Sequence, residues 1–169
     1  MLLIKREKQS KQNNNIYPVR CFSILNKVGL GGTFDHLHEG HKLLLKTALS
    51  ISNNIVIGLT TQFMLKKKKA ASKLEDYKTR ETNLKSFIST FTELQRVEIV
   101  ELNDPYGPPI SEADYEGIVV SQETYESALK INEIRESKGF TPLIIIVIPL
   151  IKDNENNKIS STRIREKLK

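Results

Sequence analysis

From residue 25 onward, the chain alternates between short apolar runs and longer stretches in which apolar side chains recur at helical spacing. A short, continuous apolar run is typical of a strand that is buried on both faces of a parallel sheet. One further stretch alternates between apolar and polar side chains, as a strand with one covered face does. Together these patterns predict strands at residues 27–32, 54–60, 96–102, 117–121 and 142–149.

Helices are predicted between and after these strands, at residues 39–52, 77–91, 123–137 and from Ser161 onward. Gly139 stands just beyond the third helix, where a glycine commonly ends a helix. The expected apolar face of the first helix consists of Leu43, Leu44, Thr47, Ala48 and Ile51, and that of the second of Leu84, Phe87, Ile88 and Phe91.

Strands that alternate with helices indicate a parallel sheet with right-handed crossovers. We therefore expect an α/β fold, a Rossmann-like doubly wound five-stranded parallel sheet, in a single domain that spans residues 25–169. Ligands of such sheets bind beyond the carboxyl ends of the strands, where the strand order reverses. The segments expected at that edge are the glycine turn after Leu30, Thr60–Thr61, Asn103–Asp104, Ser121 and the loop before Ser160.

Residues 1–24 differ from the rest of the chain, because they carry five basic side chains and one acidic side chain and are rich in polar residues. Such a composition predicts a disordered extension. A basic, acid-poor start also resembles an organelle transit peptide, so organelle targeting stays open beside a cytoplasmic location. Cys21 is the single cysteine of the chain, which excludes an intramolecular disulfide and favours a reducing compartment.

The formal net charge of +6 admits two interpretations, nucleic-acid binding or a site for an anionic small molecule. Much of the excess charge is local, in residues 1–24 and in the run Lys66–Lys69. No platform of interleaved aromatic and basic residues accompanies it, so we favour the small anion over nucleic acid. The most apolar run, Leu143–Ile148, is far shorter than the roughly 20 residues that span a bilayer, so no membrane partner is expected.

The segment Gly31–His41 contains all three histidines of the protein, His36, His38 and His41. Its glycines allow the backbone to approach a phosphate closely. The helix predicted to begin near Glu39 directs free amides and the positive end of its dipole into the same space. Since His38 and His41 can also donate hydrogen bonds to phosphate oxygens, the segment predicts a phosphate-binding turn.

Three other interpretations of this turn remain open. The three histidines could ligate a transition metal, although no cysteine or carboxylate cluster accompanies them and a turn broken by glycines is a poor rigid chelate. They could also cap the helix without any further function. A dinucleotide-binding loop fits least, because the pattern Gly-x-Gly-x-x-Gly is absent.

A second motif follows the last strand, at Lys158–Arg165. Hydroxyl side chains at the start of a helix often do no more than cap it. Here three hydroxyls in succession precede Arg163 and Arg165, which predicts a helix N-terminus that holds a polyphosphate with guanidinium support. The run Lys66–Lys69 is interpreted as a solvated surface from which one lysine is a candidate to reach the triphosphate.

These motifs resemble those of the nucleotidylyltransferase superfamily, with its HxGH and ISST signatures. More narrowly, residues 27–169 resemble phosphopantetheine adenylyltransferase of the eukaryotic and archaeal type. One departure is Asp76, which stands where many relatives have a proline and affects a helix start more than the chemistry. The segments that carry the resemblance are Gly31–Lys42, Asn103–Gly107, Val119–Thr124, Ala128–Arg135 and Ile159–Ile164.

The resemblance implies that ATP and 4'-phosphopantetheine are the substrates, with Mg²⁺, and that dephospho-coenzyme A and pyrophosphate are the products. It implies catalytic roles for His41, which would face the α-phosphate, for His38 and for Lys68. No Gly-x-x-x-x-Gly-Lys-Ser loop is present, so the chain resembles a monofunctional member. The nucleotide-binding set that it implies is Gly32, Thr33, Phe34, His38, His41, Ser121, Glu123, Thr124, Ser160, Ser161, Thr162 and Arg163, with no protein metal ligand.

Two other functions remain as alternatives. A related nucleotidylyltransferase could act on another acceptor, such as a phosphoalcohol with CTP, although the stretch Ser121–Arg135 argues against it. A basic, non-catalytic nucleic-acid-binding module would instead bind oligonucleotides in a salt-sensitive manner and release no pyrophosphate. The sequence carries no prediction of the oligomeric state.

Overall fold

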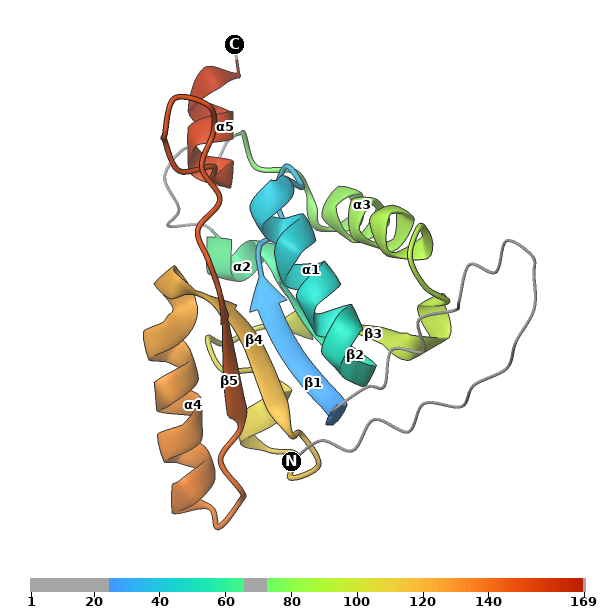
Figure 1. Ribbon diagram of the computed structural model, residues 1–169, viewed down its shortest axis with the longest axis vertical. Helices are drawn as coiled ribbons and strands as arrows, with labels where there is room; N and C mark the ends of the chain where they lie inside the picture. Colours follow the sequence, from blue (N-terminus) through green and yellow to red (C-terminus); the bar gives the residue numbers. More distant parts are fainter. Residues whose placement is uncertain (1–24, 66–72, 169) are drawn as a thin grey trace, which may run out of the picture.

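The computed structural model describes residues 25–65 and 73–168 and confirms the predicted Rossmann-like α/β fold (Figure 1). A sheet of five strands has the order β3-β2-β1-β4-β5, and every pair of neighbours is parallel. The elements are β1 (Leu25–Gly32), α1 (Glu39–Ile51), β2 (Ser52–Thr60), α2 (Gln62–Leu65), α3 (Tyr77–Ser89), β3 (Val97–Leu102), β4 (Gly117–Ser121), α4 (Tyr125–Ser137), β5 (Ile144–Ile148) and α5 (Ser161–Lys167).

The strand order reverses between β1 and β4. The chain builds outward from β1 to β2 and β3, then returns to the other side of β1 for β4 and β5. The connections after β1 and β4 therefore lead to opposite faces of the sheet, which leaves a crevice between them at the carboxyl ends of the two strands. This is the place where the sequence predicts a ligand.

Each face of the sheet has its own apolar core. On one face, α1 and α3 pack against the strands through side chains such as Leu45, Ala48 and Leu84. On the other face, α4 packs through Ala128 and Ile131, together with the loop that follows β3. Figure 1 shows α4 on the opposite side of the sheet from α1 and α3. The sheet is thus covered on both faces, as its continuous apolar strands predict.

Several details differ from the sequence expectations. Leu45 is buried on α1, whereas Leu43 is only partly buried. Phe91 lies beyond the end of α3 and is 51% exposed, so it does not belong to the helix face as predicted. The short helix α2 was not predicted, because four residues are too few to show a helical period. The strand β5 is shorter than predicted, since Pro142 and Pro149 bound it.

Asp76 and Gly139 act at the ends of helices. The Asp76 carboxylate accepts a hydrogen bond of 2.8 Å from the backbone N–H of Thr79 and so caps α3. Gly139 has a φ of 74° just after α4, which confirms its predicted role at a helix end. In the part of the chain that the structure describes, no helix is long and apolar enough to cross a membrane. The extension predicted at residues 1–24 lies outside the described residues.

Candidate functional site

A cavity of about 420 Å³ lies at the carboxyl ends of β1 and β4, in the size range of small-molecule sites. We call it the polar cavity. The turn after β1, the start of α1, the segment after β4 and the loop that leads into α5 form its walls. The polar side chains that line it are Thr33, His38, His41, Ser121, Glu123, Thr124, Lys158, Ser160, Ser161, Thr162 and Arg165.

The turn between β1 and α1 has an uncommon backbone conformation. Phe34 and His36 have φ angles of 49° and 44°, which residues other than glycine adopt rarely and mainly where surrounding contacts fix them. The side chains of Phe34 and Asp35 are both fully buried. Their burial holds the turn in place, so Thr33 and His38 on either side of it line the cavity in a fixed relation.

His38 and His41 stack on each other at the wall of the polar cavity, with ring centroids 3.9 Å apart and an angle of 22° between the planes. The Nδ1 atom of His38 accepts a hydrogen bond of 3.2 Å from the backbone N–H of Gly40, which caps α1. Because Nδ1 is the acceptor, the neutral imidazole carries its proton on Nε2. His38 is therefore prepared to donate one hydrogen bond from Nε2.

The surroundings of His38 favour its neutral form. Burial lowers the pKa of His38 below its ordinary value of 6.5, and the positive charge of Lys158 lowers this pKa further. The carboxylates of Glu39 and Asp35 act in the opposite direction with smaller effect. At neutral pH the free protein thus presents a neutral donor, Nε2–H, beside a cation, and both suit a phosphate oxygen.

Asp35 joins the first motif to the second. Its Oδ2 atom accepts a short hydrogen bond from the guanidinium of Arg165, and both side chains are buried. The Oγ atom of Ser161 donates to the Asp35 carbonyl oxygen at 2.7 Å. The Oδ1 atom of Asp35 accepts from the backbone N–H of Glu75 at 2.8 Å. These contacts dock the start of α5 onto the turn after β1, although the two segments lie more than 120 residues apart in the chain.

Arg80 on α3 holds the carboxyl ends of two neighbouring strands. Its Nη1 atom donates to the carbonyl oxygens of Thr33, at 2.8 Å, and of Thr60, at 3.0 Å. Its Nε atom donates to the carbonyl oxygen of Glu75 at 3.1 Å. The side chain is fully buried, which lowers its pKa. Arg80 thus fixes the ends of β1 and β2 from behind the cavity and does not line it.

The hydroxyls of the second motif line the cavity and also form hydrogen bonds within the protein. Ser160 caps α5 by accepting from the N–H of Arg163 at 3.3 Å, so the capping interpretation describes one of its roles. The Oγ1 atom of Thr162 accepts from Arg165 at 3.0 Å. Arg163 points elsewhere, since its guanidinium bonds Asp153 at 2.8 Å and lines a separate surface hollow.

The segment after β4 forms the opposite wall. Ser121 and Thr124 make a reciprocal capping box at a single 3-10 turn, Gln122–Thr124. The carboxylate of Glu123 forms a close ion pair with Lys158, which comes from the loop before α5. This ion pair spans two walls of the polar cavity. Lys158 and Glu123 are 33% and 60% exposed, so the pair is solvated and can open at little cost.

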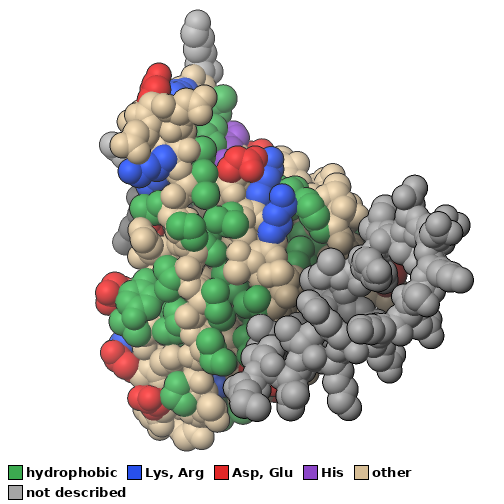
Figure 2. Space-filling view, in the orientation of Figure 1, with side chains coloured by type: hydrophobic (Ala, Val, Ile, Leu, Met, Phe, Trp, Pro, Cys, Tyr) green, Lys and Arg blue, Asp and Glu red, His purple; other side chains and the backbone are tan. Residues whose placement is uncertain are grey.

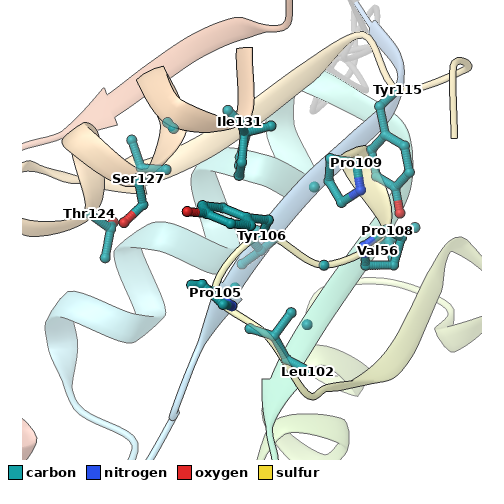
Figure 3. A pocket seen from close by; sticks show the side chains of 18 residues that line it. Val56, Leu102, Pro105, Tyr106, Pro108, Pro109, Tyr115, Thr124, Ser127 and Ile131 are labelled. Carbon is teal, nitrogen blue, oxygen red and sulfur yellow. The ribbon is translucent and has the colours of Figure 1, made fainter. Parts of the chain in front are cut away.

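A second, apolar cavity of about 160 Å³ adjoins the polar cavity and shares Gly31 and Thr124 with it. We call it the apolar cavity. It lies on the α4 face of the sheet, beneath the loop after β3, and Figure 3 shows the Tyr106 hydroxyl directed toward Thr124 and Ser127. Its side-chain walls include Val56, Leu102, Pro105, Tyr106, Pro109, Tyr115, Ile118, Val120, Ala128 and Ile131.

Arg135 on α4 holds the loop that covers the apolar cavity. Its guanidinium donates to the carbonyl oxygens of Glu112, at 2.9 Å, and of Ala113 and Tyr115, each at 3.2 Å. One turn earlier, Asn132 pairs with both the N–H and the C=O of Leu143, just before β5. Both residues belong to the stretch that carries the family resemblance, and the structure gives each a backbone-binding role.

The histidines do not converge on a common point. His36 turns away from the polar cavity, and its Nε2 atom lies 3.1 Å from the carbonyl oxygen of Lys73. Within residues 25–65 and 73–168, no three His, Cys, Asp or Glu side chains are grouped so as to hold a metal ion. The structure therefore gives no support to the interpretation of the turn as a transition-metal site.

Most residues of the expected site come together. Two described residues of the predicted nucleotide-binding set do not line the polar cavity. They are Arg163 and Gly32, whose neighbour Gly31 lines the cavity instead. Lys68 lies outside the described residues. The members that line the cavity are Thr33, Phe34, His38, His41, Ser121, Glu123, Thr124, Ser160, Ser161 and Thr162.

Lys158 and the apolar cavity are the functional features that the sequence analysis missed. Lys158 stood in the second motif, but its reach across the cavity to Glu123 depends on the fold. The apolar cavity draws residues from β1, β2, the loop after β3 and α4. The segment Asn103–Gly107 was among those that carry the family resemblance, but nothing in its sequence located the strands beneath it.

Comparison with known proteins agrees with this geometry. Residues 30–167 match the family model described as cytidylyltransferase-like. A phosphopantetheine adenylyltransferase from Methanopyrus kandleri is 42% identical over 139 residues, which cover 82% of this chain and 88% of the relative. A phosphopantetheine adenylyltransferase from Pyrococcus abyssi is 44% identical over 139 residues, which also cover 82% of this chain and 88% of the relative.

A solved structure is also similar. A crystal structure of a protein of unknown function from Archaeoglobus fulgidus has a TM-score of 0.64 and is 34% identical in sequence. The match covers 79% of this chain and 99% of that one.

Proposed function

The chain belongs to the phosphopantetheine adenylyltransferase family of the cytidylyltransferase-like proteins, and on that basis we propose that it transfers the adenylyl group of ATP to 4'-phosphopantetheine. The products are dephospho-coenzyme A and pyrophosphate. The observation that carries the proposal is the pair of adjoining cavities, one polar and one apolar, which meet at the switch point of the sheet.

In this proposal the triphosphate of ATP lies in the polar cavity. The N-terminus of α1, whose free amides and dipole favour an anion, opens into this space beside Gly40. His38 donates from Nε2, and His41 stacks beside it and faces the α-phosphate. Lys158 adds a positive charge on the opposite side. Ser160, Ser161 and Thr162 are positioned to contact the β- and γ-phosphates.

The apolar cavity suits the extended arm of the acceptor. Its walls are mainly aliphatic and aromatic, and the hydroxyls of Thr124, Ser127 and Tyr106 stand near one end (Figure 3). A chain of methylene and amide groups needs this combination of apolar surface and a few polar contacts. The two cavities share Gly31, which has no side chain to separate them. An arm in the apolar cavity would thus bring its phosphate to the polar one.

The reaction requires alignment more than proton transfer. An oxygen of the acceptor phosphate attacks the α-phosphorus of ATP, and the bond from that phosphorus to the oxygen bridging to the β-phosphate breaks. The acceptor phosphate is already an anion at neutral pH, so no general base is needed. The protein's part is to hold the two phosphates in line and to stabilise charge on the equatorial oxygens and on pyrophosphate.

Mg²⁺ is proposed to enter with ATP. Magnesium is commonly held by substrate phosphates, one or two carboxylates and several waters. Among the described residues that line the polar cavity, Glu123 is the only carboxylate on its walls, and it pairs with Lys158. The donor set therefore fits an ion that the phosphates hold, where it would neutralise charge on the leaving group.

A panel of nucleotides and acceptors tests the proposed function. Pyrophosphate release is measured with ATP, CTP and GTP, each combined with 4'-phosphopantetheine, glycerol 3-phosphate or phosphocholine. We expect release only with ATP and 4'-phosphopantetheine, and none when EDTA removes Mg²⁺. Turnover with CTP and a phosphoalcohol would favour the cytidylyltransferase alternative. Oligonucleotide binding without pyrophosphate release from any pair would contradict enzymatic function.

The variant Ser127→Phe tests the place of the acceptor arm. Ser127 is exposed on α4 and lines the apolar cavity, so a phenyl group there obstructs the cavity at little cost to the fold. We expect the KM for 4'-phosphopantetheine to rise by about tenfold or more, since one lost apolar contact is worth about 1–3 kcal/mol. The KM for ATP should stay unchanged. The control is Lys130→Phe, at an exposed position of the same helix outside the cavity.

A further inference from the structure

The two edges of the sheet differ in how they are protected. Edge strand β3 carries two exposed glutamates, Glu98 and Glu101, which discourage pairing with another strand. Edge strand β5 consists of four isoleucines and one valine and carries no charge. Ile144 is 56% exposed and Val147 is 42% exposed. An uncharged, exposed, apolar edge strand is a pairing surface unless something covers it.

The backbone of β5 presents two residues to this open edge. The N–H of Ile144 donates to the carbonyl oxygen of Glu116, just before β4, at 3.0 Å. Peptide groups point to alternate sides along a strand, so Ile144, Ile146 and Ile148 face β4. Ile145 and Val147 therefore face away from it. Among the described residues, β4 is the only strand that pairs with β5, so these two outward N–H and C=O pairs meet no strand.

We propose that the β5 edge is the two-fold interface of a homodimer, in which β5 pairs antiparallel with the same strand of a second copy. The two outward residues lie symmetrically about Ile146. With Ile146 on the two-fold axis, Ile145 is opposite the partner's Val147, and Val147 is opposite the partner's Ile145. Each outward N–H then meets a C=O of the other copy, as an isologous interface requires. The proposal does not depend on the function proposed above.

The charges around β5 favour a second copy as the occupant. No charged residue occurs from Phe140 to Ile151, so an antiparallel pair centred on Ile146 opposes no like charges. The same arrangement at β3 would bring glutamates of two copies together, which is destabilising. Pro142 and Pro149 lack an N–H and flank the strand. They limit pairing to the strand itself, so the contact forms a closed pair of copies and not a growing sheet.

The surface beside β5 extends the contact. A stable dimer buries roughly 800 Å² per partner, more than one edge of five residues supplies. Tyr125 and Leu129 on α4 are 38% and 36% exposed, and Leu150 just after β5 is 36% exposed. Figure 2 shows hydrophobic side chains gathered over β5 and its neighbourhood on the face in view. The α4 helices of two copies would pack against each other beside the joined strands.

Sedimentation equilibrium of the full chain tests the interface. We expect a species of twice the 19.3 kDa chain mass. Val147→Lys places an ammonium group beside the joined strands and should raise the dissociation constant at least tenfold, with an unchanged circular-dichroism spectrum. The matched control is Leu94→Lys, a charge at another apolar position, which is 43% exposed and far from β5 in the sheet order. This control should remain dimeric.

Oxidative cross-linking tests the register. In a Cys21→Ser background, Ile146→Cys places two sulfurs at a non-hydrogen-bonded antiparallel pair, where Cα atoms lie about 4.5 Å apart and a disulfide can form. We expect covalent dimers from this variant and none from Glu98→Cys on the other edge. A monomeric wild-type chain at tens of micromolar would overturn the proposal. So would a dimer that Val147→Lys leaves intact, or a chain that dimerises only when residues 1–24 are removed.

Discussion

At the scale of single residues, the polar cavity combines side chains that face a ligand with side chains that hold the site together. His38 and His41 lie on its wall, whereas Asp35 and Arg80 act from behind it. The distinction cannot be made from residue type, because histidine and arginine both bind phosphate readily. It depends on burial and on which atoms already have partners, and each class leads to a different prediction.

We predict that His41→Ala lowers turnover by about 10²- to 10³-fold, the effect of losing one donor to the transition state. Pyrophosphate release with ATP and 4'-phosphopantetheine is the measurement. The matched control is His36→Asn. His36 points away from the cavity and has a φ of 44°, a conformation that asparagine tolerates. Near-normal turnover in folded His41→Ala would remove His41 from the mechanism.

The pKa of His38 gives a second prediction. In the free protein we expect it below 6.5, because burial and Lys158 both disfavour the charged ring. A bound triphosphate stabilises the charged form, so ATP should raise this pKa. The measurement is an NMR titration of the histidine Cε1–H resonances, assigned with single variants. A His38 pKa that ATP leaves unchanged would place the triphosphate elsewhere.

The lowered pKa also sets the sign of a pH effect on stability. Between the folded pKa and 6.5, the unfolded chain binds more protons at His38 than the folded protein does. The contribution of His38 to the free energy of unfolding is therefore complete above pH 6.5. It is lost as the pH falls from 6.5 through the pKa of the folded protein. We expect His38→Gln to flatten this part of the stability profile in urea titrations. An equally steep profile in the variant would contradict the assignment.

At the scale of elements, α5 depends on one buried ion pair. Arg165 and Asp35 are almost fully buried together, whereas Arg163 and Asp153 are about 30% exposed. Breaking a buried pair leaves an uncompensated charge, so we expect Arg165→Ala to lower the free energy of unfolding by about 3–5 kcal/mol. Arg163→Ala, on the same helix, should cost less than about 1 kcal/mol. Urea denaturation measures both, and similar losses would contradict this view of α5.

The sequence predicted the elements well where the periodic pattern was long. Five strands and four helices lie where the alternation of apolar runs and amphipathic stretches placed them. It failed at α2, where four residues show no period, and at Phe91, because α3 already ends at Ser89. Arg80 was also missed as a core residue, because only its carbonyl partners, at the carboxyl ends of two strands, make the burial of a charge tolerable.

At the scale of the whole molecule, the switch point brings together segments that are far apart in the chain. The turn after β1, the turn after β4 and the loop before α5 meet around one cavity. Ligand binding should therefore stabilise the fold as a unit. At 100 times its Kd, MgATP is expected to raise the free energy of unfolding by about 2.7 kcal/mol. Thermal denaturation with and without MgATP measures this, and CTP at the same concentration is the control.

The sequence by itself determined the fold class, the family and most of the residues on the cavity wall. Those features depend on local order, such as apolar periodicity, a glycine turn before a helix and hydroxyls at a helix start. Only the tertiary structure decided that Arg163 faces Asp153 while Arg165 is buried on Asp35, that Lys158 reaches Glu123, and that an apolar cavity adjoins the polar one. The physical reason is that each of these depends on contacts between segments that the sequence separates, and on burial, which a local pattern does not encode.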